Sequence, residues 1–138
     1  MKTLTFIYML LIAVVLNACN DREIIDRKDG DSLPAVSNLA LQQDGPMARL
    51  TWAIPAAIPE SIEQPVRVYI EVKEILNPTR AISVFNITLS NSPTEFVYEI
   101  PDVNKTYHLT VKLNGTTKNR DVNYSSNIYS LGQTVIFN

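Results

Sequence analysis

Apolar residues recur at every second position through most of this chain, and this period of two restricts the fold more than any other feature. In residues 66–72 and again in residues 107–113 every second side chain is apolar, and the intervening ones are mostly polar. Successive side chains of an extended strand point to opposite faces, so such segments form strands with one buried face. No useful length of sequence repeats its apolar residues at helical spacing. We therefore expect an all-β domain.

Seven strands are predicted, separated by turns. Val36, Leu39 and Leu41 mark the first strand. The residues expected to share a face in four of the others are Ala48, Leu50 and Trp52; Val66, Val68, Ile70 and Val72; Phe96, Tyr98 and Ile100; and Tyr107, Leu109, Val111 and Leu113. The fourth strand, residues 82–89, carries apolar side chains on both faces, so we expect a bulge or a strand covered on both sides. The last strand, residues 128–137, is expected to bend at Gly132. Turns are predicted at residues 44–46, 77–78, 90–93, 101–102 and 114–115.

The layout of these strands favours one sandwich. Seven antiparallel strands over about 100 residues are typical of a β-sandwich, and one-sided alternation is what an antiparallel sheet with a solvated face requires. The chain has a single Cys, at position 19, so the domain has no internal disulfide and depends on its core alone. We predict a single seven-stranded antiparallel β-sandwich over residues 34–138.

This part of the chain resembles a fibronectin type III domain, one of the immunoglobulin-like sandwiches. The residues that carry the resemblance are Pro34, Val36, Leu39, Leu50-Thr51-Trp52, Pro55 and residues 96–113. The resemblance implies that Trp52 packs in the core and that Tyr107 is the tyrosine of a tyrosine corner. Position 101 is Pro where the family usually has Leu, so Ile100 or Val103 is expected to fill that place.

A secretory leader, residues 1–18, precedes the domain. Lys2 gives the amino end a positive charge, residues 4–16 are almost entirely apolar, and the small residue Ala18 comes before Cys19. The apolar run is shorter than the roughly 20 residues that cross a bilayer. Residues 16–19 resemble the lipobox of bacterial lipoproteins, which implies cleavage between Ala18 and Cys19 and lipidation of Cys19. The alternative is a plain signal peptide with a chance Cys, or an uncleaved anchor.

Residues 19–33 comprise the lipidated Cys and a flexible acidic tether, because this segment is charged and has little to bury. Asp21, Glu23 and Asp26 resemble the export signal of Bacteroidetes surface lipoproteins, and residues 31–33 resemble the O-glycosylation motif of the same bacteria, with Ser32 as acceptor. Otherwise the tether is a solvated spacer and Ser32 a linker serine. The whole layout resembles small lipoproteins of gut Bacteroidetes, which implies a lipid-anchored outer-membrane location, with the domain on the periplasmic or the cell-surface side.

Signatures of catalysis, metal binding and cofactor binding are not recognised in the sequence. His108 is the only histidine and lies between two residues expected to face inward, so it is expected on the outer face. Glu71 and Glu74 fall on opposite faces of one strand and make a poor acid pair. Loss of the leader, with Lys2, takes the formal net charge from −2 to −3, and no basic stripe is present. We expect no enzyme activity, no metal, no cofactor and no nucleic-acid partner.

Two loops are the predicted sites for a protein partner. Residues 54–65 contain three prolines and expose Ile54 and Ile58 unless these fold inward, and residues 114–124 combine charged and aromatic side chains. In a fibronectin-like topology both loops lie at one pole, where the amino terminus also enters. The candidate contact residues are Ile58, Lys118, Arg120, Asp121 and Tyr124. We expect a non-catalytic module that binds or scaffolds another envelope protein.

Glycan capture is the alternative function, in a polysaccharide-uptake system or in adhesion. Tyr69, on the predicted wet face of the third strand, and Tyr124 or Tyr129 could offer rings on which sugars stack. Such a site needs two or three exposed aromatic rings in one plane. The alternative for these residues is ordinary cross-strand tyrosines, which are common in sheets.

Overall fold

The computed structural model describes residues 32–120, 122 and 124–138. The chain divides after Gly30 into two units, and the second, Asp31–Asn138, holds every described residue. The predictions for the leader, for Cys19, for residues 20–31 of the acidic tether and for Asp121 lie outside the described residues. In the described part we find no helix long and apolar enough to span a bilayer.

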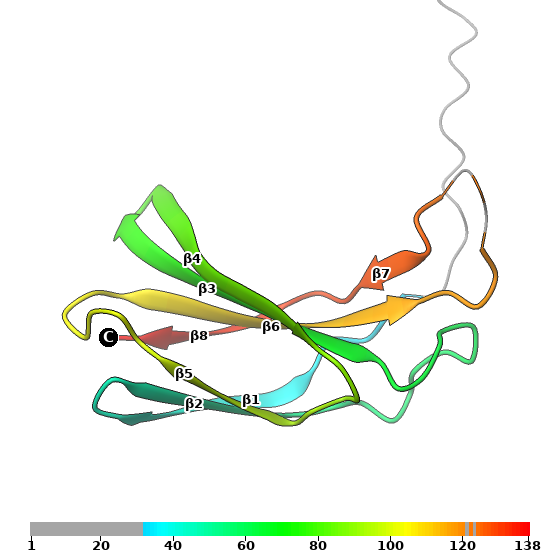
Figure 1. Cartoon of the computed structure of the whole chain (residues 1–138), viewed down its shortest axis with the longest axis horizontal. Coiled ribbons are helices and arrows are strands. Elements are labelled where there is room, and N and C mark those ends of the chain that lie inside the picture. The colour runs from blue at the N-terminus through cyan, green and yellow to red at the C-terminus, as the bar shows by residue number, and fades with distance from the viewer. Residues whose placement is uncertain (1–31, 121, 123) are drawn as a thin grey trace, which may run out of the picture. The chain divides into compact units, whose positions relative to one another are not determined.

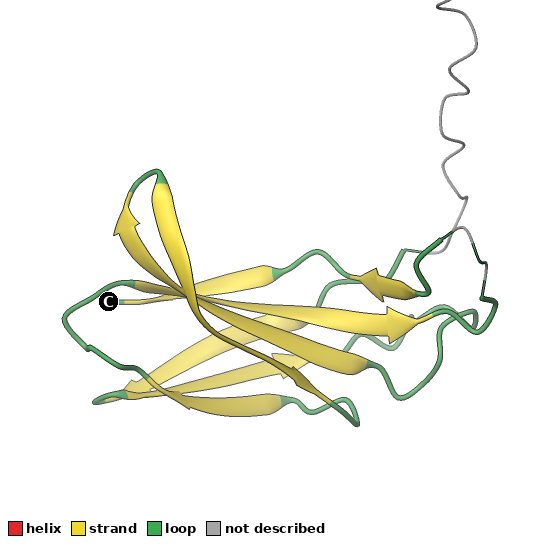
Figure 2. Ribbon diagram, turned by 45° about the horizontal axis from the view of Figure 1, so that its top comes forward, coloured by secondary structure: helices red, strands yellow, loops and turns green. Residues whose placement is uncertain are grey.

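The described residues form strands and loops without a helix (Figure 2). The strands are β1 (Ser37–Asp44), β2 (Met47–Ala53), β3 (Arg67–Asn77), β4 (Arg80–Leu89), β5 (Glu95–Glu99), β6 (Tyr107–Thr116), β7 (Asn127–Tyr129) and β8 (Gln133–Phe137). All strand pairs are antiparallel, and they make two sheets. One has the order β1-β2-β5; the other has the order β4-β3-β6-β7, with β8 also paired to β6. The all-β prediction is confirmed.

The two sheets lie as two layers with the core between them (Figure 1). Both sheets contribute fully or nearly fully buried side chains, among them Ala48, Leu50 and Trp52 of β2, Val68, Ile70 and Val72 of β3, and Leu109, Val111 and Leu113 of β6. Burial of one such aliphatic side chain contributes about 1.5–3 kcal/mol. These residues sit at every second position, so the alternation in the sequence is what places them in one layer.

A bulge in β1 explains why its apolar residues are unevenly spaced. Val36 is buried, and Leu39 and Leu41 pack against the core, although the first step is three residues long. Asn38, in that step, has a φ of +53°, and the β1–β2 register shifts between Ser37 and Ala40. Asn tolerates this left-handed conformation better than most residues do. The extra residue restores the inward phase of the strand.

The bulge expected in the fourth strand is also present. Val72 pairs with Phe85, but Lys73 pairs with Ser83, so Val84 is the unpaired extra residue. Phe85 and the two following alternate residues pack against the core, whereas Val84 and Ile82 are exposed. Ile82 lies near the tip of the β3–β4 hairpin, which stands away from the smaller sheet (Figure 1). A bulge therefore separates the packed half of β4 from its exposed half.

The turn predicted at residues 114–115 is wrong. β6 continues through Asn114 and Gly115, which pair with Tyr129 and Ile128 of β7. A Cβ built on Gly115 would lie 2.7 Å from Cγ2 of Ile62, so the glycine serves close packing inside a strand. Asn-Gly is a frequent turn dipeptide, and only the tertiary contact with Ile62 distinguishes this case.

The predicted last strand is divided into β7 and β8, so the described residues contain eight strands where seven were expected. Ser130 still contacts β6, since its backbone N–H donates to the Leu113 carbonyl and its hydroxyl accepts from the Leu113 N–H. Regular pairing resumes at Gln133. A Cβ on Gly132 would come within 2.7 Å of Thr110 and 2.9 Å of Lys112, so Gly132 does mark the irregular segment, as predicted, but as a break between strands.

Candidate functional site

The two loops singled out in the sequence are joined at one end of the sandwich. Ile62 forms an isolated antiparallel bridge with Thr117. The Glu63 N–H donates to the Thr116 carbonyl at 2.8 Å, and the Lys118 N–H donates to the Ser61 carbonyl at 2.9 Å. These backbone bonds connect segments more than 50 residues apart in the sequence. The structure therefore builds one platform from the loop after β2 and the loop after β6. It is here called the loop platform and comprises the described residues 54–65, 117–120, 122 and 124–126.

A buried contact anchors this loop platform to the sandwich. The Ile62 side chain is fully buried and sits on Gly115, and Leu33 lies against the same glycine. Leu33 is close to the start of the described chain, so the chain enters the domain at the end that carries the loop platform. Hydrophobic packing from three separate segments thus holds the platform in place.

The predicted contact residues of the loops do not all reach the surface. Ile58 packs against the core together with Ile54, so both fold inward and Ile58 is a support of the platform. Lys118 and Arg120 are exposed, and Tyr124 is 39% exposed. Val122 is fully exposed, and the sequence reasoning missed it because an isolated valine in a polar loop carries no periodic signal.

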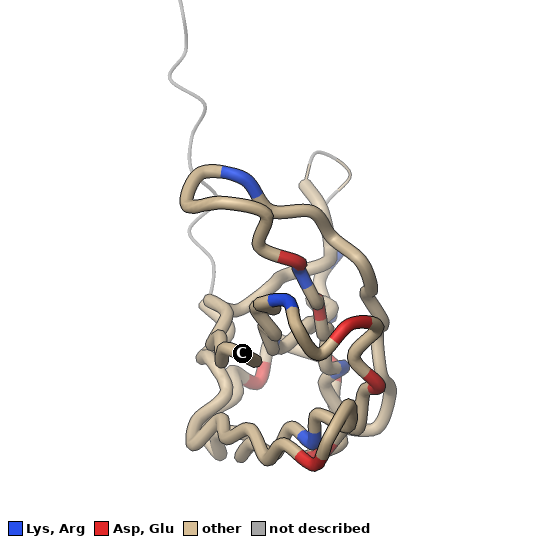
Figure 3. The backbone as a smooth tube through the Cα atoms, turned by 90° about the vertical axis from the view of Figure 1, so that its left-hand side faces the viewer, with Lys and Arg blue, Asp and Glu red and all other residues tan. Residues whose placement is uncertain are grey.

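A second group of side chains covers the outer face of the larger sheet. Tyr69 stands beside Thr88 of β4 and Lys112 of β6, and in the next row Glu71 stands beside Asn86 and Thr110. The Thr110 and Thr134 hydroxyls hydrogen-bond to each other at 2.8 Å. Hydroxyl and amide groups therefore share this face, here called the outer face, with one tyrosine and with charged side chains. Charged residues of both signs are scattered over the domain (Figure 3).

Arg67 organises the end of the outer face nearest the loop platform. Its Nη2 donates to Asn114 Oδ1 at 2.8 Å, to Thr116 Oγ1 at 3.0 Å and to Asn127 Oδ1 at 3.1 Å. The three acceptors are neutral and come from β6 and β7. Among the described residues no carboxylate is paired with this guanidinium, and its Nη1 and Nε have no partner there. The result is a cation held in a fixed position with its charge uncompensated by the described residues.

Tyr69 and Tyr129 meet on this face, but they do not form the flat platform that the glycan hypothesis requires. Their ring centroids are 6.0 Å apart and the ring planes are at 81°, an edge-to-face pair. Tyr129 is 54% exposed and Tyr69 is half-buried. Burial, together with the nearby Glu71 carboxylate, raises the pKa of Tyr69. Only Tyr129 presents a largely open ring, so a sugar could stack on one ring and not across two.

The remaining predicted residues have structural positions. Trp52 is 5% exposed and Tyr107 is 1% exposed, and the Tyr107 ring packs edge-on against Phe137. Ile100 is buried while Val103 is 46% exposed, so Ile100 is the residue that fills the core there. Ser32 is exposed at the start of the described chain. The Trp52 indole N–H is buried without a hydrogen-bond partner among the described residues.

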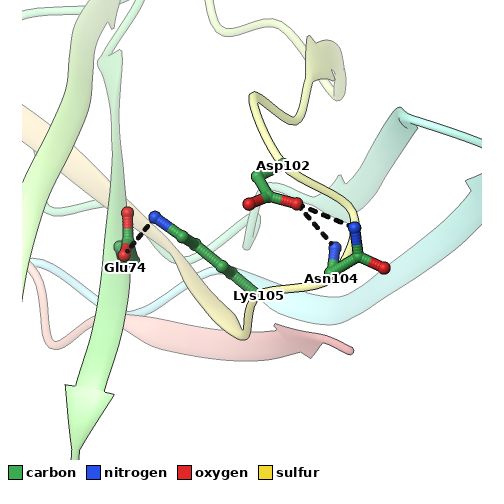
Figure 4. Close-up of polar contacts among 4 residues, drawn as sticks. All are labelled: Glu74, Asp102, Asn104 and Lys105. Carbon is green, nitrogen blue, oxygen red and sulfur yellow. Dashed lines mark hydrogen bonds and ion pairs between the residues drawn. The ribbon is translucent and has the colours of Figure 1, made fainter.

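The far end of the sandwich holds the main charged cluster, and it stabilises a turn (Figure 4). Lys105 Nζ lies 2.9 Å from Glu74 Oε1, and hydrogen bonding to Glu74 raises the pKa of Lys105. Asp102 Oδ1 accepts hydrogen bonds from the Asn104 backbone and side-chain nitrogens at 3.0 and 3.1 Å, which lowers the pKa of Asp102. This is an Asx turn tied to β3 by one ion pair. Its carboxylates are engaged by these partners.

The described residues show no group of three His, Cys, Asp or Glu side chains placed to hold a metal ion. His108 pairs with Lys73 and Ile136 in the sheet, at an outward position between the buried Tyr107 and Leu109. Glu71 and Glu74 are each in an ion pair, with Lys73 at 3.2 Å and with Lys105. The candidate surfaces are therefore the loop platform, with its exposed Lys118 and Arg120, and the Arg67 end of the outer face.

Comparison with known proteins identifies the family to which the chain belongs. A search of curated proteins finds no match. A family model described as a domain of unknown function, DUF4945, matches residues 19–137, which is most of the chain. The match includes every strand of the sandwich and both surfaces described above. The chain belongs to the DUF4945 family.

Proposed function

We propose that this protein is a non-catalytic binding module that is anchored to the outer membrane through a lipid on Cys19 and presents its loop platform to another envelope protein. The observation that carries the proposal is the joining of two distant loops into one supported surface. A surface held by backbone hydrogen bonds and a buried side chain loses little conformational freedom on binding, which favours affinity. Lys118, Arg120, Val122 and Tyr124 are the residues of this surface that offer charge and apolar area.

The strand order supports a fibronectin type III-like identity for the domain. That family places its first, second and fifth strands in one sheet and the remaining ones in the other. Here β1, β2 and β5 form one sheet and β3, β4, β6, β7 and β8 the other. Domains of this class bind through end loops held by rigid sheets, which agrees with a site at the loop platform.

The lipid anchor rests on the leader and the residues around Cys19. The family match begins at Cys19, which is the first residue of the predicted mature chain. An anchor at Cys19 and the entry of the chain beside Leu33 would keep the loop platform near the membrane surface. Mass spectrometry of the native protein tests this part: a diacylglyceryl thioether on an amino-terminal Cys19 is expected, and a free thiol on the full-length chain would refute it.

The partner interface is tested by crosslinking in intact cells followed by purification of the protein. The double variant Arg120→Ala with Tyr124→Ala should lose most of the crosslinked partner because it removes one of the exposed cations and the tyrosine ring of the platform. The matched control is Arg80→Ala with Leu76→Ala, which removes one exposed cation and one exposed apolar side chain from the β3–β4 hairpin. Equal recovery of partner with both variants and the wild type would count against the loop platform as the interface.

A further inference from the structure

We infer that the Arg67 end of the outer face is a binding site for glycans that carry carboxylate groups, with Arg67 and Lys112 receiving the carboxylate and Tyr129 stacking against the sugar ring. This site is distinct from the loop platform and is assigned a different ligand. It brings together a fixed cation, a second cation, an open aromatic ring and a set of neutral polar groups.

The positive charge of Arg67, which is not paired with a carboxylate among the described residues, favours an anionic ligand. A half-buried guanidinium is normally matched by a carboxylate, because removing a charge from water is costly. Here Nη2 is occupied by neutral oxygens of Asn114, Thr116 and Asn127, which orient the group but leave its charge intact. Nη1 and Nε have no partner among the described residues, so N–H donors remain for a ligand. Charge-assisted hydrogen bonds to carboxylates are among the stronger contacts a protein can offer.

Lys112 adds a second positive charge to the same face. It stands opposite Tyr69, which is two positions after Arg67 on β3. Its side chain runs past Gly132, where a Cβ would lie 2.9 Å from the Lys112 Cε, so the glycine leaves room for the lysine. The outer face also carries the carboxylate of Glu71, which is in an ion pair with Lys73 at 3.2 Å. Both Arg67 and Lys112 are therefore without an acidic partner among the described residues.

A sugar fits the surroundings of these cations better than an acidic peptide does. Tyr129 presents a 54% exposed ring beside Arg67, since it pairs with Asn114, the residue that Arg67 bonds. Aromatic faces stack on the C–H face of a sugar ring. Several other positions of the larger sheet and of β7 carry hydroxyls and amides that can bond sugar hydroxyls, namely Asn86, Thr88, Thr110, Thr134 and Asn127. A uronic acid combines the ring, the hydroxyls and the carboxylate that such a face can recognise.

The test is affinity electrophoresis of the whole protein in native gels containing polygalacturonate, with dextran as a neutral polymer. Retardation by polygalacturonate and not by dextran is expected, and it should weaken as salt is added because screening reduces the attraction. Arg67→Gln and Tyr129→Ala should each weaken binding by about tenfold, the factor that corresponds to loss of one charge-assisted bond or one stacked ring. Thermal unfolding of each variant verifies that the domain is folded.

The matched control is Arg49→Gln, which removes an exposed cation from β2 in the other sheet. It should bind polygalacturonate as the wild type does. No retardation of the wild type, or equal loss in the Arg49 variant, would overturn the proposal, the second because it would indicate attraction by net charge alone. Undiminished binding by Tyr129→Ala would also overturn it. Equal retardation by polyglutamate would assign the site to acidic peptides and refute the glycan assignment.

Discussion

Replacement of Gly115 by Ala tests whether the loop platform depends on close packing. The new Cβ would stand 2.7 Å from Ile62 Cγ2, well inside ordinary contact distance, and 3.4 Å from Leu33 Cδ2. Ile62 is fully buried, so its side chain has little room to retreat. Overpacking of this kind costs about 1–3 kcal/mol. The substitution also stabilises the folded state by about 0.4–1 kcal/mol, because Ala lowers the conformational entropy of the unfolded chain relative to Gly.

The expected net loss of stability is therefore about 1–2 kcal/mol, or a fall in Tm of the order of 5–10 °C for a domain of this size. Urea denaturation gives the free energy of unfolding directly. The stability effect of Gly115→Ala should be coupled to that of Ile62→Ala, because the second substitution removes the clashing methyl group. Ile62→Ala alone should cost about 2–5 kcal/mol because it leaves a cavity. In that background Gly115→Ala should cost nothing further, since the added methyl group fills part of the space.

Two results would refute this account. A neutral or stabilising Gly115→Ala would mean that Ile62 moves aside without cost. An undiminished penalty in the Ile62→Ala background would mean that the cost arises from the backbone and not from the contact. If the account holds, Gly115→Ala should also lower recovery of the crosslinked partner, because the contact anchors the loop that carries Lys118.

Three further predictions concern the core, the sheet edge and the acid range. Leu109→Ala, in a fully buried position, should lower the free energy of unfolding by about 2–5 kcal/mol in urea denaturation. Leu131→Ala, at a position 84% exposed, should change it by no more than about 0.5 kcal/mol, and similar losses for the two variants would contradict the assigned core. Ile82→Lys with Val84→Lys should reduce aggregation on heating, measured by light scattering, with little change in Tm, because β4 is an edge strand that exposes these two apolar side chains. Unchanged scattering would exclude this edge as the aggregating surface. The lowered pKa of Asp102 means that folding stabilises its ionised form, so its contribution to stability is present above the unfolded pKa of about 3.9 and is lost as the pH falls through the lower folded pKa. Asp102→Asn should therefore be less stable than the wild type at neutral pH, and the difference in free energy of unfolding should vanish in strong acid. A constant difference at all pH values would contradict the Asx-turn interpretation.

Much of the sandwich could be predicted because the alternation of apolar and polar residues along the sequence indicates where strands form. The buried sets on β2, β3 and β6 follow from the positions of apolar residues two apart, and the bulge in β4 follows from the change of phase between Val84 and Phe85. The turn predicted at Asn114-Gly115 failed for a definite reason. The same dipeptide suits a turn or a close contact within a strand, and Ile62, which decides between them, lies more than 50 residues away.

For the candidate sites, the residue types and the polar loops could be read from the sequence, which pointed to Tyr69, Tyr129, Lys118 and Arg120 as surface candidates. Which of these residues act together follows from the folded arrangement. Arg67 takes its three acceptors from residues 47 to 60 positions away in the chain. The two tyrosine rings meet edge-on across β3 and β7, which no spacing reveals. Alternating apolar residues predict strands because successive side chains of a strand point to opposite faces, which is a local property. A site that combines several strands depends on the register between them, and long-range packing sets that register.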